Sequence, residues 1–185
     1  MLPLQDIRVL DFSTLLPGPL ASLILAEAGA EVIKVERPGT GEDMRGYPPH
    51  LDGASGSFAI LNRGKRAIAV DLRAPGAAQS LLGLAPTIDI VLEQFRPGVM
   101  ARLGLGYDAW RAANPKILYC AITGYGQDGP RAREAGHDMN YEARTGILAL
   151  AEGADGTPGI SPALVGDIAG GTYPAVFNAA NEQAV

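Results

Sequence analysis

Cysteine and histidine are scarce in this sequence, with one cysteine and two histidines among 185 residues. A single cysteine, Cys120, excludes an intramolecular disulfide and fits a reducing compartment, so we expect a cytoplasmic protein. The apolar run around it, residues 117–122, predicts a buried strand and an inert core thiol. We expect no metal site.

Basic residues are outnumbered, with 15 Lys and Arg against 20 Asp and Glu and a formal net charge of −5. This balance argues against non-specific nucleic-acid binding, which needs a basic surface. The longest mainly apolar run, residues 15–26, contains Pro17, Gly18 and Pro19 and is too short to span a bilayer. Residues 1–12 lack the basic and apolar regions of a secretory signal. We therefore expect neither nucleic acid nor a membrane as a partner.

The opening strand–helix–strand segment, residues 7–36, lacks the G-x-G-x-x-G fingerprint, which argues against a nicotinamide or flavin site there. No G-x-x-x-x-G-K-[ST] string occurs in the sequence, which argues against a P-loop. What the chain does contain is an alternation of strand and helix patterns. Strands are expected at 7–12, 31–36, 67–72, 88–93 and 117–123, and helices at 20–28, 76–84, 99–103 and 108–113. This order predicts an α/β fold: a Rossmann-like parallel sheet with helices on both faces. In such sheets ligands bind beyond the carboxyl ends of the strands.

Two acid–base side chains stand in glycine-bounded turns within residues 136–171. His137 follows Gly136, and Asp167 follows Gly166. Two proton-carrying groups of different type are what a reaction that removes and returns a proton needs. A structural interpretation is also open, because Asp is a favoured helix N-cap. Asp138 could cap the helix that follows it, and Asp167 could cap a helix over residues 169–180.

Several short motifs resemble, in the same order, the family III CoA-transferase superfamily (CaiB/BaiF type) in its α-methylacyl-CoA racemase branch. The motifs are Val9-Leu10-Asp11-Phe12-Ser13, Pro17-Gly18-Pro19, residues 29–39, Leu61-Asn62-Arg63-Gly64-Lys65-Arg66, Val70-Asp71-Leu72, Phe95-Arg96-Pro97-Gly98-Val99, residues 102–106, Gly124-Tyr125-Gly126-Gln127, Gly136-His137-Asp138-Met139-Asn140-Tyr141 and Gly166-Asp167-Ile168-Ala169-Gly170-Gly171. The resemblance covers nearly the whole chain.

The resemblance implies that residues 1–185 are the N-terminal CoA-binding α/β portion of a larger interlocked-dimer fold. The family's small domain and C-terminal return are absent from this chain, and its tail after Val176 departs from the family pattern. The implied ligand is an acyl-CoA, with no cofactor beyond the CoA moiety. The full-length form is expected to be an intertwined homodimer, and the isolated chain is expected to be poorly active.

The resemblance also assigns candidate CoA contacts. Arginines that pair with phosphate in forked geometry are needed for CoA, and Arg37 and Arg102 are the direct candidates. Residues 69–72 are expected to line the adenosine end. The full set of candidate contacts is Arg37, Ala69, Val70, Asp71, Leu72, Arg102, Gly136, Asp138 and Tyr141.

In the racemase branch, two bases face the α-carbon of a 2-methylacyl-CoA thioester. The resemblance assigns these roles to His137 and Asp167. One base removes the α-proton and the other returns a proton to the opposite face. For both to work near neutral pH, burial must raise the pKa of Asp167. Backbone N–H groups over residues 167–170 are candidate donors to the enolate oxygen. Racemisation is the reaction we favour from the sequence.

Two other interpretations stay open. In a CoA transferase an aspartate attacks the thioester and forms an acyl anhydride, then an aspartyl-CoA thioester. That nucleophile would be Asp138 or Asp167, with Asp138 the closer match, and His137 has no necessary part in transfer. The third interpretation is an inactive fragment or binding module.

Overall fold

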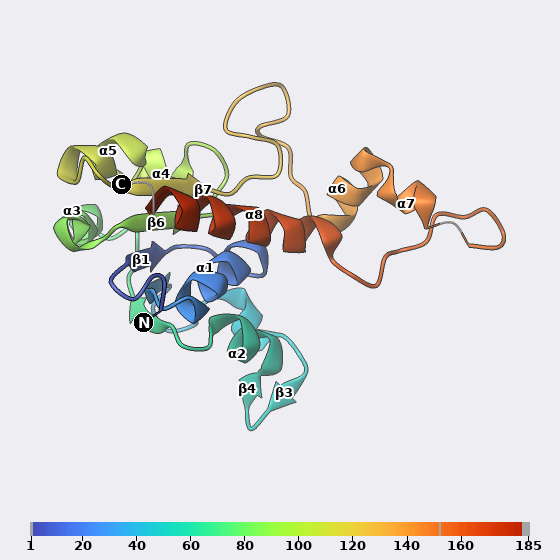
Figure 1. Ribbon diagram of the computed structural model, residues 1–185, viewed down its shortest axis with the longest axis horizontal. Helices are drawn as coiled ribbons and strands as arrows, with labels where there is room; N and C mark the ends of the chain where they lie inside the picture. The colour runs from blue at the N-terminus through green and yellow to red at the C-terminus, as the bar shows by residue number, and fades with distance from the viewer. Residues whose placement is uncertain (1, 152, 183–185) are drawn as a thin grey trace.

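A computed structural model describes residues 2–151 and 153–182. Its centre is a five-stranded sheet in the order β5-β2-β1-β6-β7, with every neighbouring pair parallel (Figure 1). The strands of this sheet are β1 (Arg8–Asp11), β2 (Glu31–Glu36), β5 (Arg66–Ala69), β6 (Ile90–Glu93) and β7 (Leu118–Ala121). A separate antiparallel hairpin is formed by β3 (His50–Leu51) and β4 (Ala54–Ser55). The predicted parallel α/β sheet is confirmed.

Helices connect the strands and cover the sheet. They are α1 (Pro17–Glu27), α2 (Gly56–Asn62), α3 (Ala77–Leu82), α4 (Val99–Arg102), α5 (Tyr107–Ala113), α6 (Asp138–Thr145), α7 (Ile147–Leu150) and α8 (Val165–Glu182), with 3₁₀ turns η1 (Asp43–Gly46) and η2 (Ala85–Thr87). In Figure 1, α8 runs along the sheet beside α1, while α6 and α7 project beyond the start of α8. Among the described residues, no helix is both long and apolar enough to cross a bilayer.

Two apolar cores lie on opposite faces of the sheet, because successive side chains of a strand point to opposite sides. Leu10 and Val91 face the first core, where Trp110 of α5 is fully buried. Val9 and Ile90 face the second core, which α1 and α8 cover. Strands buried on both faces in this way read as nearly continuous apolar runs. The expected placement of helices on both faces is therefore confirmed.

Some element boundaries differ from the expected ones. The strand expected at 67–72 ends at Ala69, so residues 70–72 lie beyond it. The helix expected from Leu20 begins at Pro17, because proline fits the first turn of a helix, where its missing N–H costs no hydrogen bond. His50, expected in a loop, lies in the short strand β3 and is exposed as expected. The end of the tail, residues 183–185, lies outside the described residues.

Candidate active site

A cavity of about 930 Å³ lies at the carboxyl ends of β6 and β7. Residues of the turn before α1, of the long loop between β7 and α6, of α6 and of the start of α8 also line it. His137 and Asp167 both line this cavity, together with Gly136 and Tyr141. The position fits the rule that α/β sheets bind ligands beyond the carboxyl ends of their strands. The fold therefore brings together two side chains that are 30 positions apart in the sequence.

His137 is the N-cap of α6. Its backbone is extended, with φ −127°, and its N–H donates to Oδ1 of Asn140 at 2.9 Å. The side chain of His137 is exposed on the cavity wall. The sequence-based suggestion that Asp138 caps this helix is wrong, because Asp138 is its first helical residue.

Asp167 lies in the first turn of α8 and is half-buried. Its backbone N–H donates to Oδ1 of Asp138 at 3.0 Å. Burial raises the pKa of the Asp167 carboxyl above its ordinary value, and the nearby Asp138 carboxylate raises it further, while His137 opposes the rise. The side chain is thus a cavity-facing carboxyl held near a second carboxylate. Helix α8 begins at Val165, before the 169–180 range expected from sequence.

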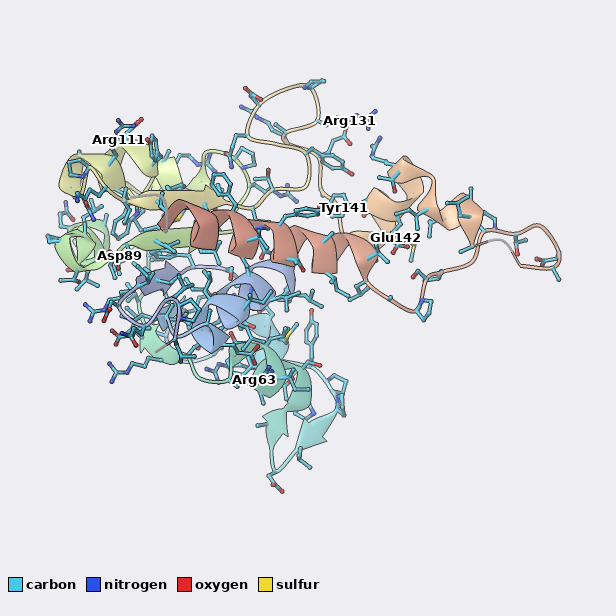
Figure 2. All side chains as sticks on the ribbon, viewed as in Figure 1. Arg63, Asp89, Arg111, Arg131, Tyr141 and Glu142 are labelled. Carbon is cyan, nitrogen blue, oxygen red and sulfur yellow. The ribbon has the colours of Figure 1, made fainter. Side chains whose placement is uncertain are left out.

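Two buried acidic residues of α6 bind the N-terminus of α8. Besides the bond from Asp167 to Asp138, the N–H of Val165 donates to Oε1 of Glu142 at 3.4 Å. The first N–H groups of a helix have no partner within the helix, and negative charge is favoured there. Figure 2 shows Glu142 where α6 meets the start of α8. Asp138 is buried and does not line the cavity.

The ring of Tyr141 leaves no room for a side chain at two glycines of the sequence motifs, Gly124 and Gly136. A Cβ on Gly124 would lie 2.2 Å from the Tyr141 hydroxyl oxygen, and one on Gly136 would lie 2.8 Å from its ring. The Tyr141 ring also meets the ring of Tyr125 edge-on, with centroids 5.4 Å apart. Burial raises the pKa of the Tyr141 hydroxyl. The ring therefore fixes the loop between β7 and α6 against the helix that carries His137.

The turn before α1 is tightly constrained. Leu15 has φ +62°, a conformation that non-glycine residues rarely adopt, and its side chain lines the cavity. The N–H of Gly18 donates to Oε1 of Gln94 at 2.9 Å, and a Cβ at Gly18 would lie 2.1 Å from Cβ of Ser13. Only glycine fits there, so this turn sits directly against the end of β6.

A buried network of charged side chains holds the start of that turn at Ser13. Asp11, at the end of β1, accepts the N–H of Ser13 at 2.8 Å. Lys34 of β2 donates to the carbonyl oxygen of Ser13 at 2.7 Å and pairs with Glu42 at 2.7 Å. Lys65 lies 3.6 Å from Asp11, and burial lowers the pKa of Lys65 to about 8. Lysine and carboxylate groups this deeply buried need such partners.

The predicted CoA contacts on the other strand ends lie apart from the cavity lining. Arg37 is exposed and pairs with Asp43, and Arg102 is exposed on α4. Within residues 69–72, Val70 and Leu72 pack against the first core, whereas Ala69 and Asp71 are exposed. All of these residues stay predicted CoA contacts.

Several lining residues carry functional groups that the sequence reasoning did not single out as site residues. They are Gln94, Arg96, Tyr125, Arg131, Glu134 and Arg144. Gln94, Arg96 and Tyr125 lie just after β6 and β7. They could have been predicted from the rule that ligands bind beyond the carboxyl ends of parallel strands. Arg131, Glu134 and Arg144 lie in an irregular loop and on α6, and no local pattern marks them.

A second cavity, of about 660 Å³, lies between β7, α4, α5 and α8. Glu93 lines it, with the Tyr119 hydroxyl 3.5 Å from its Oε1 and the Phe95 N–H 2.7 Å from its Oε2. Burial raises the pKa of Glu93 to about 7. Cys120, expected to be fully buried, is half-buried and packs against the second core, because β7 is an edge strand of the described sheet.

Comparison with known proteins identifies the family. The model described as CoA-transferase family III matches residues 4–181. The chain is 40% identical over 174 residues to succinyl-CoA:glutarate CoA-transferase of Mus musculus, covering 94% of this chain and 40% of that protein. It is 38% identical over 168 residues to alpha-methylacyl-CoA racemase of Homo sapiens, covering 91% and 40%. A CAIB/BAIF family protein from Brucella suis matches with a TM-score of 0.91 and 34% identity, over 98% of this chain and 50% of that one.

The chain spans about 40 to 50% of the length of these relatives. The family model nevertheless covers almost all of the chain, and the turns that carry His137 and Asp167 lie inside the match. The chain therefore belongs to CoA-transferase family III.

Proposed function

We propose that the protein transfers CoA between carboxylic acids, with Asp167 as the covalent nucleophile. The observation that carries this proposal is the position of Asp167: it is a half-buried carboxyl that faces a large cavity from the first turn of a helix. Relatives whose names describe CoA transfer support it, including the succinyl-CoA:glutarate CoA-transferase of Mus musculus. This reverses the preference drawn from the sequence, which favoured racemisation.

The chemistry balances without any further reactant. The Asp167 carboxylate attacks the thioester carbonyl, the acyl–sulfur bond breaks, and CoA leaves as a thiolate. The thiolate then attacks the aspartyl carbonyl of the resulting anhydride, which releases the first acid as a carboxylate and leaves an aspartyl-CoA thioester. An acceptor carboxylate repeats both steps in reverse order. The products are a new acyl-CoA and the original Asp167 carboxylate.

Asp167 suits the nucleophilic role better than Asp138, which the sequence made the closer match. Asp138 is 7% exposed and does not line the cavity, and its Oδ1 already accepts the N–H of Asp167. Gly166 comes directly before Asp167, and Gly170 lies about one helical turn after it. Both glycines also line the cavity. Small neighbours of this kind let a substrate approach closely.

For CoA itself, we retain Arg37 and Arg102 as phosphate contacts. Replacing both with Ala is expected to weaken CoA binding by about 2 kcal/mol or more, because hydrogen bonds to charged groups contribute roughly 1.5–3 kcal/mol each. Calorimetric titration with CoA measures this. The matched control is Arg111→Ala, which removes an exposed guanidinium that donates to the Tyr107 hydroxyl on α5. Unchanged CoA affinity in the double variant would rule the two contacts out.

Racemisation is the second candidate, and one observation favours it. His137 and Asp167 line the same cavity, which is the arrangement that a two-base reaction needs. The human racemase named above is also 38% identical to this chain. Transfer needs no second base, whereas racemisation requires both His137 and Asp167.

One experiment separates the two reactions. Acyl-CoA is incubated with the protein and hydroxylamine, without an acceptor acid, and Asp167 is examined by peptide mass spectrometry. We expect a hydroxamate at Asp167 that persists in His137→Ala and disappears in Asp167→Asn. In parallel, a 2-methylacyl-CoA is incubated in D₂O. Deuterium uptake at the α-carbon that depends on His137, with no adduct at Asp167, would overturn transfer in favour of racemisation.

A further inference from the structure

A cluster of charged side chains lines the cavity on the side of the β7–α6 loop and α6. Arg131 and Glu134 come from the loop, and Arg144 comes from α6. Figure 2 shows Arg131 on this loop, next to α6. All three residues line the same cavity as Asp167, but they come from other segments than α8, which carries Asp167.

Arg144 is held in a fixed orientation. Its Nε–H donates to the Tyr125 hydroxyl at 3.1 Å, and its Nη2 donates to Oε2 of Glu134 at 2.7 Å. The guanidinium carbon lies 5.4 Å from the centre of the Tyr125 ring. An arginine has five N–H donors, so three remain after these two bonds. With 44% of its side chain exposed, the group keeps an accessible edge for a ligand.

The charge around this wall is unbalanced. Glu134 is shared, because Arg131 also approaches its Oε2 at 3.5 Å. A third guanidinium on the cavity, Arg96, makes no ion pair within residues 2–151 and 153–182. Three arginines and two carboxylates, Glu134 and Asp167, give the lining a formal charge of +1 with His137 neutral. An anionic group on the substrate is favoured in such a cavity.

We propose that the Arg144–Tyr125–Glu134 cluster binds the distal carboxylate of a dicarboxylic acyl group whose other end reacts at Asp167. This rests on the proposed transfer function and names its substrate class. The planar guanidinium matches a carboxylate in forked geometry. A dicarboxylic acid has one carboxyl group for the reaction at Asp167 and a second one for the guanidinium of Arg144, and both residues line the same cavity. A monocarboxylic acid of the same length has no second carboxylate for the guanidinium.

The test compares two acids of equal length, glutarate and pentanoate, by calorimetric titration of the purified protein. Glutarate is expected to bind at least tenfold more tightly than pentanoate. Arg144→Gln is expected to remove that preference, a loss of about tenfold or more, because a charge-assisted bond is lost. The control variant is Arg133→Gln, an exposed arginine of the same loop that does not line the cavity, and it should keep the preference. Circular dichroism checks that both variants fold.

Titration with CoA distinguishes a carboxylate site from a phosphate site. CoA affinity is expected to stay unchanged in Arg144→Gln. A loss of CoA affinity with an intact preference for glutarate would assign Arg144 to a CoA phosphate and overturn the proposal, as would equal binding of the two acids by the unaltered protein.

The hydroxylamine assay with glutaryl-CoA and pentanoyl-CoA keeps this proposal separate from the transfer reaction. If Asp167 forms no adduct but Arg144 still selects glutarate, the transfer function fails and the carboxylate site stands. If Asp167 forms adducts from both thioesters at equal rates, and Arg144→Gln changes neither rate, transfer stands and the carboxylate site fails.

Discussion

The carboxylate of Asp138 accepts the backbone N–H of Asp167 and lies close enough to the Asp167 carboxyl to raise its pKa, so a change at Asp138 should be measurable at Asp167. Asp138→Asn keeps an oxygen acceptor for the Asp167 N–H but removes the negative charge. Because that charge contributes to the raised pKa of Asp167, the pKa should fall. The nucleophile must be ionised, so the acid limb of adduct formation should move to lower pH. The rate of hydroxamate formation, followed between pH 4 and pH 8, measures the shift.

Glu142→Gln is the matched control for this shift. It alters a buried carboxyl of the same helix that binds the same end of α8, but Glu142 is not among the groups that shift the pKa of Asp167. The other two groups that face Asp167 from α6, His137 and Tyr141, are intact in both variants. An acid limb that moves equally in Asp138→Asn and Glu142→Gln, or in neither, would contradict this account.

Glu93 should make the protein less stable as the pH rises. Its pKa is raised from 4.5 to about 7 in the folded state, so between these values the folded protein holds a proton that the unfolded chain has released. The free energy of unfolding therefore falls across this window, by up to about 3 kcal/mol. Glu93→Gln should remove that slope. Urea unfolding at pH 4.5 and pH 7.5 measures it, with exposed Glu134→Gln as the control, and an unchanged slope would exclude Glu93 as its source.

At the scale of elements, the buried ion pair of β2 with the loop before η1 should be costly to break. Lys34→Ala leaves Glu42 buried without its cation and Ser13 without its donor. Removing one member of a buried pair typically costs about 3–5 kcal/mol. Replacing both members by apolar residues, Lys34→Met with Glu42→Leu, should cost less, because no charge stays buried alone. Chemical unfolding measures both variants, and a single variant as stable as the double one would refute this interpretation.

Helix α8 has one packed side and one exposed apolar side. One side packs on α1 and the sheet through Ala175, whereas Tyr173 is 77% exposed and Val176 is 63% exposed. Exposed apolar groups gathered on one helix indicate a contact surface. The sequence resemblance implies an intertwined homodimer for the full-length form, so we propose a second copy of the chain as the partner at this face.

At the scale of the whole molecule, this surface predicts self-association. Tyr173→Lys with Val176→Lys should shift the protein toward a monomer, because two charges would have to be buried in the contact. Light scattering coupled to size exclusion measures the mass across a dilution series. Leu51→Lys is the control, since Leu51 is equally exposed but lies on the β3–β4 hairpin. A monomer before any substitution, or a dimer that both variants retain, would contradict the prediction.

The sequence by itself determined the parallel sheet, most strand positions and the two turns that carry His137 and Asp167. These depend on local rules: apolar runs bounded by turn residues for the strands, and glycines where the chain must bend closely. Boundaries shifted where tertiary packing decides, as at Ala69, beyond which the chain leaves the sheet. The family resemblance was also visible in the sequence, which made Asp138 the closer match for a nucleophile, whereas our proposal for the folded chain prefers Asp167.

Only the tertiary structure decided which charged residues share a cavity. Asp138 and Asp167 are 29 positions apart, and the packing of α6 against the start of α8 buries one and leaves the other facing the cavity. Arg144 has no local motif, and its position on the wall follows from Tyr125 and Glu134, which lie in a loop without regular structure. Periodicity and turn chemistry act over a few residues. Burial, pKa and shared cavities arise from contacts between distant segments, so they appear only once the chain is folded.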